Sequence, residues 1–144
     1  DNILSVLETL NYSKSRQISE LDNLISDFGL NKIRKTRANL LSGGERRRLE
    51  IARAISNNPK FILLDEPFAG VDPIAVQDIQ QMINKLKSKN IGVLITDHNV
   101  RETLSITDRS YLLYDGKVLK SGKTSDLVND SEVRRLYLGQ NFKF

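Results

Sequence analysis

The chain has no cysteine among its 144 residues, which excludes disulfide bonds and thiolate metal sites. It has one histidine and no tryptophan, and aromatic residues make up only 6% of it. No apolar run approaches the roughly 20 residues of a membrane-spanning helix, and Asp1-Asn2 lacks the basic region of a signal peptide. These absences favour a soluble globular domain in a reducing compartment, and nothing speaks for secretion.

The formal net charge of +4 permits an anionic partner such as nucleic acid or a membrane surface. Basic residues are nevertheless spread among acidic ones, and the densest cluster, Arg46-Arg47-Arg48, falls inside a predicted helix. Aromatic residues are not interleaved with basic ones, as stacking on single strands would require. We therefore expect no nucleic-acid partner.

Apolar spacing predicts that the first part of the chain is helical. One short stripe and one longer stripe precede Gly29, which suits the left-handed stop of a helix. A third helix should start at residues 41–44 and end before Pro59. The two stripes consist of Ile3, Leu4, Leu7 and Leu10, and of Ile18, Leu21, Ile25 and Phe28.

The second part of the chain changes to an α/β pattern. Residues 61–64 and 93–96 are continuous apolar runs, typical of strands buried on both faces of a parallel sheet. Between them, Asp72-Pro73 is an N-cap followed by proline at the first helical position. The fold class is thus α/β, with a helical part at 1–57 and a strand–helix–strand part within 58–144, divided at Asn57-Asn58-Pro59.

The stretch Ser121-Gly122-Lys123-Thr124 ends like a phosphate-binding loop, G-x-x-x-x-G-K-[ST]. The earlier glycine, Gly116, is one residue too far away. Asp115-Gly116 also lies between two strand-like runs, as in a hairpin turn. We therefore predict that Gly122 ends a strand, that Thr124 caps a short helix, and that other residues would handle a nucleotide.

Leu41-Ser42-Gly43-Gly44-Glu45 places a hydroxyl and two glycines at a helix start, where main-chain N–H groups can approach an anion. The structural interpretation is an ordinary capping box of Ser42 with Glu45. Two adjacent glycines argue for more, because they weaken a first turn unless something must come near.

Three further stretches stand where chemistry is expected. Asp65-Glu66 follows the first apolar strand, so one carboxylate could hold Mg²⁺ and the other could orient water. Pro67 should keep Glu66 extended. Thr96-Asp97-His98 ends the second strand and should lie beside it. The third stretch is Asp72, at the start of a predicted helix. Taken alone, the two carboxylates could be solvated, His98 could be a structural residue and Asp72 could merely cap its helix. The order and spacing of all four stretches together favour a functional site.

Together these stretches resemble the nucleotide-binding domain of ATP-binding cassette (ABC) proteins, over the whole chain and with high specificity. The resemblance implies a partial P-loop NTPase of ABC type, a parallel RecA-like sheet with flanking helices plus a helical subdomain. It also implies ATP and Mg²⁺ as cofactors. The matching stretches are residues 41–45, 61–66, 69–72 and His98.

The resemblance implies a role for each matching residue. Asp65 would stabilise Mg²⁺ through water, Glu66 would polarise the hydrolytic water, and His98 would contact the γ-phosphate. Asp72 would lie at the dimer interface. The γ-phosphate held by the opposite subunit would be contacted by Ser42, Gly43 and Gly44, with Glu45 supporting the turn.

Within the family, three stretches resemble more closely the ATPase subunits of lipopolysaccharide export transporters. They are residues 41–48, 65–73 and 95–104, and the ending Tyr137-Leu138-Gly139 also fits. Such subunits act as head-to-tail homodimers at the cytoplasmic face of the inner membrane, bound to transmembrane permease subunits. The ATPases of branched-chain amino-acid importers are similar and remain an alternative.

The sequence also departs from the family pattern. It has no G-x-x-x-x-G-K-[ST], and neither the glutamine loop nor the adenine-stacking aromatic can be placed. We therefore expect a truncated domain that is inactive and poorly stable alone. Two other hypotheses stay open: a non-enzymatic binding module, and an ABC protein acting on DNA or ribosomes, although no sustained heptad supports the latter.

Overall fold

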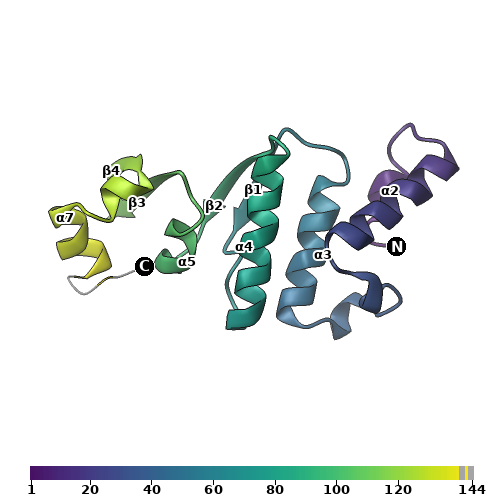
Figure 1. Ribbon diagram of the computed structural model, residues 1–144, viewed down its shortest axis with the longest axis horizontal. Helices are drawn as coiled ribbons and strands as arrows, with labels where there is room; N and C mark the ends of the chain where they lie inside the picture. The colour runs from purple at the N-terminus through teal and green to yellow at the C-terminus, as the bar shows by residue number, and fades with distance from the viewer. Residues whose placement is uncertain (140–141, 143–144) are drawn as a thin grey trace. The chain divides into compact units, whose positions relative to one another are not determined.

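The computed structural model describes residues 1–139 and 142, so residues 140, 141, 143 and 144 of the predicted α/β part lie outside it. Contacts divide the chain into two units, Asp1–Thr96 and Asp97–Phe144 (Figure 1). This division does not test the boundary predicted at Asn57-Asn58-Pro59, which separates a helical part from an α/β part. Each unit is described separately below.

The first unit begins with two helices, α1 (Leu4–Leu7) and α2 (Lys14–Asp27), which pack against each other. Ser13 caps α2 by accepting a hydrogen bond from the Arg16 N–H, and Gly29 has a φ of +61° just past its end. The predicted stripe is buried at Ile25 and Phe28, whereas Ile18 is 55% exposed. The apolar face of α2 is therefore covered only toward its C-terminal end.

The third predicted helix is confirmed as α3 (Gly43–Ile55), after two short 3₁₀ turns, Asn31–Ile33 and Ala38–Leu40. Its buried side chains are Ile51, Ala52 and Ile55, spaced by one and three residues as on a helix face. The helix ends ahead of Pro59, which cannot donate a main-chain hydrogen bond within a helix.

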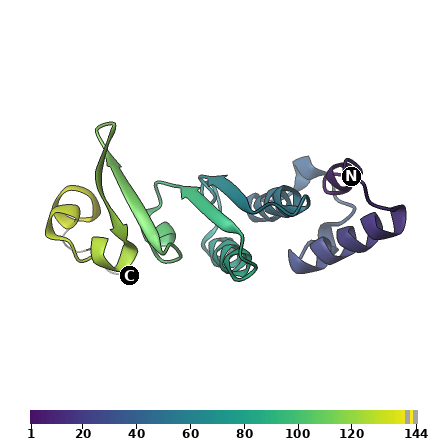
Figure 2. The ribbon, with the colours of Figure 1, turned by 90° about the horizontal axis from the view of Figure 1, so that it is seen from above.

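The predicted strand–helix–strand unit is confirmed as β1 (Phe61–Asp65), α4 (Pro73–Ser88) and β2 (Gly92–Thr96). The strands are parallel, and their register runs from Phe61 opposite Gly92 to Asp65 opposite Thr96. Helix α4 lies on one side of the two strands (Figure 2). It buries Ile79, Met82, Ile83 and Leu86.

The prediction that both faces of β1 are buried is wrong. Ile62 and Leu64 are buried, but Leu63 is 73% and Phe61 55% exposed. Alternate residues of a strand point to opposite faces, and within residues 1–96 the helical layer of α4 covers only one of them. The continuous apolar run thus places Ile62 and Leu64 on the covered face and leaves Phe61 and Leu63 as an apolar surface on the other face.

The second unit contains a short helix α5 (Val100–Leu104), a hairpin of β3 (Arg109–Tyr114) and β4 (Lys117–Lys123), and short helices α6 (Thr124–Leu127) and α7 (Ser131–Val133). One π-helical turn, Arg134–Leu138, follows α7. Asp115 and Gly116 have φ values of +49° and +70°, as a tight two-residue hairpin turn requires. Leu112, Leu127 and Val133 form the core of this unit.

The stretch Ser121–Thr124 forms no strand–loop–long helix arrangement. Gly122 lies one residue before the end of β4, close to the predicted place, and the helix that follows has only four residues. The prediction that Thr124 caps this helix is wrong, because Lys123 is the N-cap residue. The buried Thr124 hydroxyl instead forms hydrogen bonds with Ser110 (2.9 Å) and Thr107 (3.2 Å).

Within residues 1–139 and 142, none of the helices combines the length and the apolar character that crossing a membrane requires.

Candidate functional site

The 41–45 turn opens α3 with a complete capping box. The Ser42 main-chain N–H and hydroxyl both donate to Glu45 Oε2 (2.9 Å each), and the Glu45 N–H donates back to Ser42 Oγ (3.3 Å). These hydrogen bonds, first that from the Ser42 main chain and then that from its hydroxyl, lower the pKa of the Glu45 carboxyl. The structural interpretation of the turn is therefore correct, and Glu45 supports it as predicted.

The two glycines of this turn have a packing role that sequence reasoning missed. A Cβ atom on Gly43 would lie 2.7 Å from the Gly70 carbonyl oxygen, and one on Gly44 would lie 2.6 Å from Ala75 Cβ. Both distances are too short for a side-chain carbon. Close packing of α3 against the start of α4 thus requires glycine here, whatever ligand approaches the turn.

Asp65 ends β1 directly opposite Thr96, the last residue of β2. The Thr96 hydroxyl donates a hydrogen bond to Asp65 Oδ1. The expectation that the ends of the two strands meet is confirmed for this pair. One carboxylate at the carboxyl edge of a parallel sheet can hold Mg²⁺ through water, because Mg²⁺ keeps several water ligands and completes its shell with phosphate oxygens.

Glu66 is not extended, so that prediction is wrong. Its φ is +45°, in the left-handed region that residues other than glycine rarely occupy, and the following Pro67 restricts it further. Such a conformation costs about 1–3 kcal/mol and persists where surrounding contacts enforce it. The Glu66 N–H donates to the Thr96 carbonyl (2.7 Å), and the Ala69 N–H donates to the Glu66 carbonyl (3.1 Å).

Arg47 of α3 supplies a third contact to Glu66. Its Nη2 donates to the Glu66 carbonyl oxygen (3.0 Å), and its Nη1 pairs with Glu50 Oε2 (2.8 Å). The sequence contained no signal for the first contact, because it joins residues 19 positions apart in different elements.

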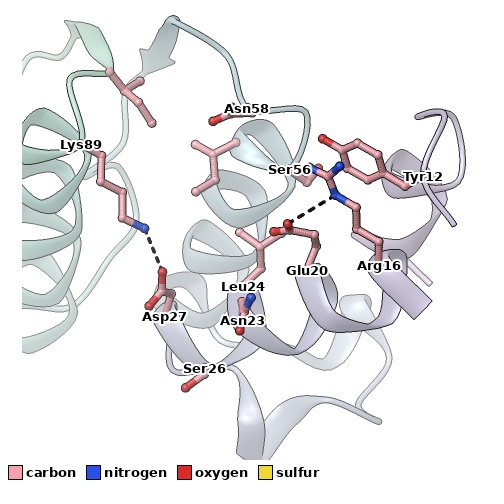
Figure 3. Close-up of a pocket in the computed structure, with 12 residues that line it drawn as sticks. Tyr12, Arg16, Glu20, Asn23, Leu24, Ser26, Asp27, Ser56, Asn58 and Lys89 are labelled. Carbon is pink, nitrogen blue, oxygen red and sulfur yellow. Dashed lines mark hydrogen bonds and ion pairs between the residues drawn. The ribbon is translucent and has the colours of Figure 1, made fainter. Parts of the chain in front are cut away.

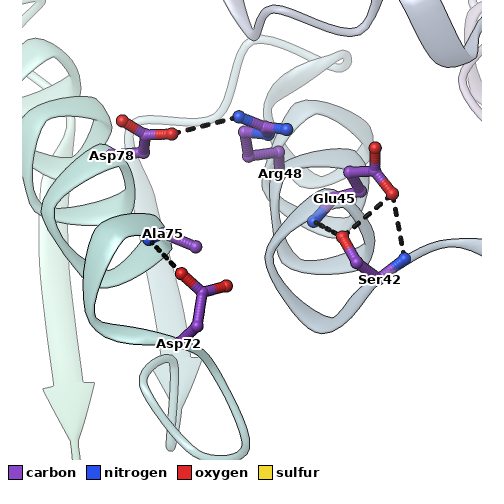
Figure 4. A network of polar contacts seen from close by, with 6 residues as sticks. All are labelled: Ser42, Glu45, Arg48, Asp72, Ala75 and Asp78. Carbon is purple, nitrogen blue, oxygen red and sulfur yellow. Dashed lines mark hydrogen bonds and ion pairs between the residues drawn. The ribbon is translucent and has the colours of Figure 1, made fainter.

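Asp72 caps α4 as predicted, accepting a hydrogen bond from the Ala75 N–H (3.0 Å; Figure 4). On the next turn of α4, Asp78 Oδ2 accepts from Arg48 Nη1 (3.2 Å). Figure 4 shows this contact and the two caps on facing helices, α3 and α4. The 41–45 turn and Asp72 are thus held on packed elements of the same unit.

Asp97 and His98 belong to the second unit. The Asp97 side chain is fully buried, and its Oδ1 accepts from the Asn99 N–H (2.7 Å) and Nδ2 (2.9 Å), just before α5. His98 Nδ1 lies 3.9 Å from the same oxygen, and the histidine side chain is 69% exposed. The imidazole is therefore accessible to a ligand.

Among residues 1–139 and 142, no group of three or more histidine, aspartate or glutamate side chains is arranged to hold a metal ion. Asp65 would thus supply a single carboxylate, which fits a hydrated Mg²⁺ bound mainly by nucleotide phosphates and does not fit a structural metal.

A cavity of about 480 Å³ lies elsewhere in the first unit, between α2 and the segments that follow α3 and α4 (Figure 3). Arg16 lies over the Tyr12 ring (3.9 Å) at one end, and Asp27 pairs with Lys89 (2.9 Å) at the other. None of the predicted site residues lines it.

The sequence model of the ABC transporter family matches residues 1–69. Over 142 residues the chain is 56% identical to an uncharacterized ABC transporter ATP-binding protein of Rhizobium meliloti, covering 99% of this chain and 53% of that protein. Over 143 residues it is 54% identical to the lipopolysaccharide export system ATP-binding protein LptB of Acidithiobacillus ferridurans, covering 99% and 59%. The chain thus spans just over half the length of these curated relatives.

Solved structures have the same fold. An ATP-binding cassette of an ABC transporter in its ADP conformation superposes with a TM-score of 0.76 at 27% identity, covering 96% of this chain and 61% of that one. A dimeric, post-hydrolysis cassette bound to ADP and Pi superposes with a TM-score of 0.72 at 26% identity, covering 85% and 54%. The predicted partial cassette fold is therefore confirmed.

Proposed function

We propose that the chain is part of an ABC transporter ATP-binding domain and that the complete protein hydrolyses ATP to drive transport, because nearly the whole chain is similar to such proteins. One observation carries this proposal most directly. Asp65-Glu66 stands at the carboxyl end of β1, and a hydrogen bond from Arg47 joins it to α3, the helix that begins with the 41–45 turn. Both stretches lie in the first unit, Asp1–Thr96.

In this proposal some residues of the chain act at one ATP site and the others act at a second ATP site. Asp65 holds a water of hydrated Mg²⁺, and Glu66 accepts a proton from the attacking water as general base. His98 contacts the γ-phosphate of ATP. Bound Mg²⁺ supplies charge neutralisation of the phosphates.

The remaining residues of the chain act at the second ATP site of a head-to-tail homodimer. When the Ser42 hydroxyl turns away from Glu45 Oε2, it can donate to the γ-phosphate of ATP held by the second subunit. The main-chain N–H groups of Gly43 and Gly44, at the N-terminus of α3, can approach the same anion. Glu45 keeps the turn in shape through the capping box. Asp72 lies at the subunit interface.

The proposed partners are a second copy of the protein and transmembrane permease subunits, which dock on the helical part and its rim. We place the complex at the cytoplasmic face of the inner membrane, and we expect no nucleic acid in it. The dimeric cassette structure at 26% identity supports the first partner.

We propose lipopolysaccharide export as the transport process, since the LptB of Acidithiobacillus ferridurans is 54% identical. An uncharacterized ABC transporter ATP-binding protein is similar to the same degree, at 56% identity. Import of branched-chain amino acids stays the second candidate, because the ATPases of such importers have similar sequence stretches. Co-purification of the complete protein with its permease subunits, and stimulation of ATPase activity by lipopolysaccharide or by an amino acid, would decide between them.

The enzymatic role is tested by Glu66→Gln in the complete protein. Glutamine has nearly the same shape but cannot accept the proton, so we expect Mg²⁺-dependent turnover to disappear while ATP still drives dimerisation. Turnover at the wild-type rate would remove Glu66 as the base. An inactive wild-type protein that still binds ATP would favour the alternative of a non-enzymatic binding module.

A further inference from the structure

We infer that Arg47 is a positioning residue that holds Glu66 in its left-handed conformation. This inference rests on the proposed function, because it concerns the residue proposed as general base. It starts from the main chain of Glu66, whose φ of +45° before a proline has to be enforced by its surroundings.

Hydrogen bonds from three places hold this main chain. The Glu66 N–H donates to the carbonyl of Thr96 at the end of β2 (2.7 Å), and the Ala69 N–H donates to the Glu66 carbonyl (3.1 Å). Arg47 Nη2 donates to the same carbonyl (3.0 Å). Only the bond from Arg47 is donated by a side chain, so it can be removed by substitution without changing the main chain.

The contact uses a property of arginine that lysine lacks. The rigid guanidinium holds Nη1 on Glu50 Oε2 (2.8 Å) while Nη2 reaches Glu66. Glu50 lies one turn further along α3 and fixes the direction of the guanidinium. A lysine ammonium is a single point charge on a flexible stem and cannot keep both contacts in fixed geometry.

The position of Arg47 gives this contact a consequence for the assembled protein. The residue lies four positions after Gly43, the first residue of α3. The helix whose start is proposed to meet one ATP is therefore tied directly to the residue proposed as general base at the other ATP. Movement of α3 away from β1 would lengthen the bond to the Glu66 carbonyl and release the turn.

The test compares Arg47→Met, Arg47→Lys and a matched control, Arg53→Met, in the complete protein. Arg53 lies on the last turn of the same helix with an exposed side chain, so its replacement removes the same charge away from Glu66. We expect kcat of Arg47→Met to fall roughly tenfold or more, the effect of one lost hydrogen bond from a charged group. The KM for ATP should stay within about twofold, because no ATP contact is lost.

A second readout does not depend on activity. Hydrogen exchange of the Ala69 amide, measured without nucleotide, should be faster in Arg47→Met than in the wild type and unchanged in Arg53→Met. Arg47→Lys should be intermediate in both kcat and exchange, and it serves as the main variant if Arg47→Met does not fold. Wild-type kcat and exchange in Arg47→Lys, or equal effects of the two methionine variants, would overturn the inference.

These outcomes separate the inference from the proposed function. If the complete wild-type protein hydrolyses no ATP, the proposed function fails, and the exchange of Ala69 still decides whether Arg47 holds the turn. If Glu66→Gln abolishes turnover but Arg47→Met leaves both kcat and exchange unchanged, the proposed function stands and the role of Arg47 is refuted.

Discussion

Gly44, which we propose to lie near a phosphate, also has a packing role. Its missing side chain lets α3 approach Ala75 on α4, where a Cβ atom would lie only 2.6 Å from Ala75 Cβ. We predict that Gly44→Ala in the complete protein lowers the free energy of unfolding by about 1–3 kcal/mol, as overpacking does. Thermal unfolding without nucleotide measures this effect apart from any phosphate contact.

The matching control is Gly44→Ala combined with Ala75→Gly. Removing the facing methyl group should restore part of the lost stability, although glycine within α4 itself costs about 0.5–1 kcal/mol. If the double variant loses as much free energy of unfolding as the two single variants added together, the contact with Ala75 is not the reason that position 44 requires glycine.

At the scale of elements, Asp27 joins α2 to α4. Its two carboxylate oxygens accept from Lys85 and Lys89 of the α4 region (2.9 Å each). These ammonium groups, Lys85 first, lower the pKa of Asp27 below its ordinary value of 3.8. A lowered carboxyl pKa stabilises the fold above the ordinary value, and this contribution is lost as the pH falls through the lowered pKa.

We predict that Asp27→Asn destabilises the complete protein near neutral pH and that its difference from the wild type shrinks below pH 3.8. Added salt should reduce the difference at neutral pH, because the carboxylate is partly exposed and screened. Denaturant unfolding at several pH values checks this, with Glu8→Gln as a control for removing an exposed carboxylate. A difference that is constant with pH would contradict the role of the ion pairs.

Sequence reasoning predicted the elements well and their contacts poorly. Periodicity and caps predicted α2, α3, β1, α4, β2 and the hairpin, because these signals are local. It could not predict that α4 covers one face of β1 only, or that Thr124 turns its hydroxyl toward Ser110. The left-handed Glu66 was missed because contacts from Arg47, Thr96 and Ala69 override the preference set by Pro67.

For the whole molecule, the uncovered face of the two-stranded sheet has the largest consequence. Phe61, Leu63 and Leu94 are 55%, 73% and 45% exposed, and two strands alone rarely form a stable sheet. We predict that residues 1–144 expressed alone associate or melt without a cooperative transition. Calorimetry together with light scattering checks this, and a cooperative transition of a monomer would contradict it.

The central claim is that the chain serves two ATP sites, with Glu66 at one and the 41–45 turn at the other. The most direct test mixes two inactive forms of the complete protein, Glu66→Gln and Ser42→Arg, and measures Mg²⁺-dependent ATP turnover. Random dimers would regain roughly one quarter of the wild-type sites, because each mixed dimer has one site with both parts intact. Restored turnover is the predicted result, whereas a mixture as inactive as its components would contradict the account.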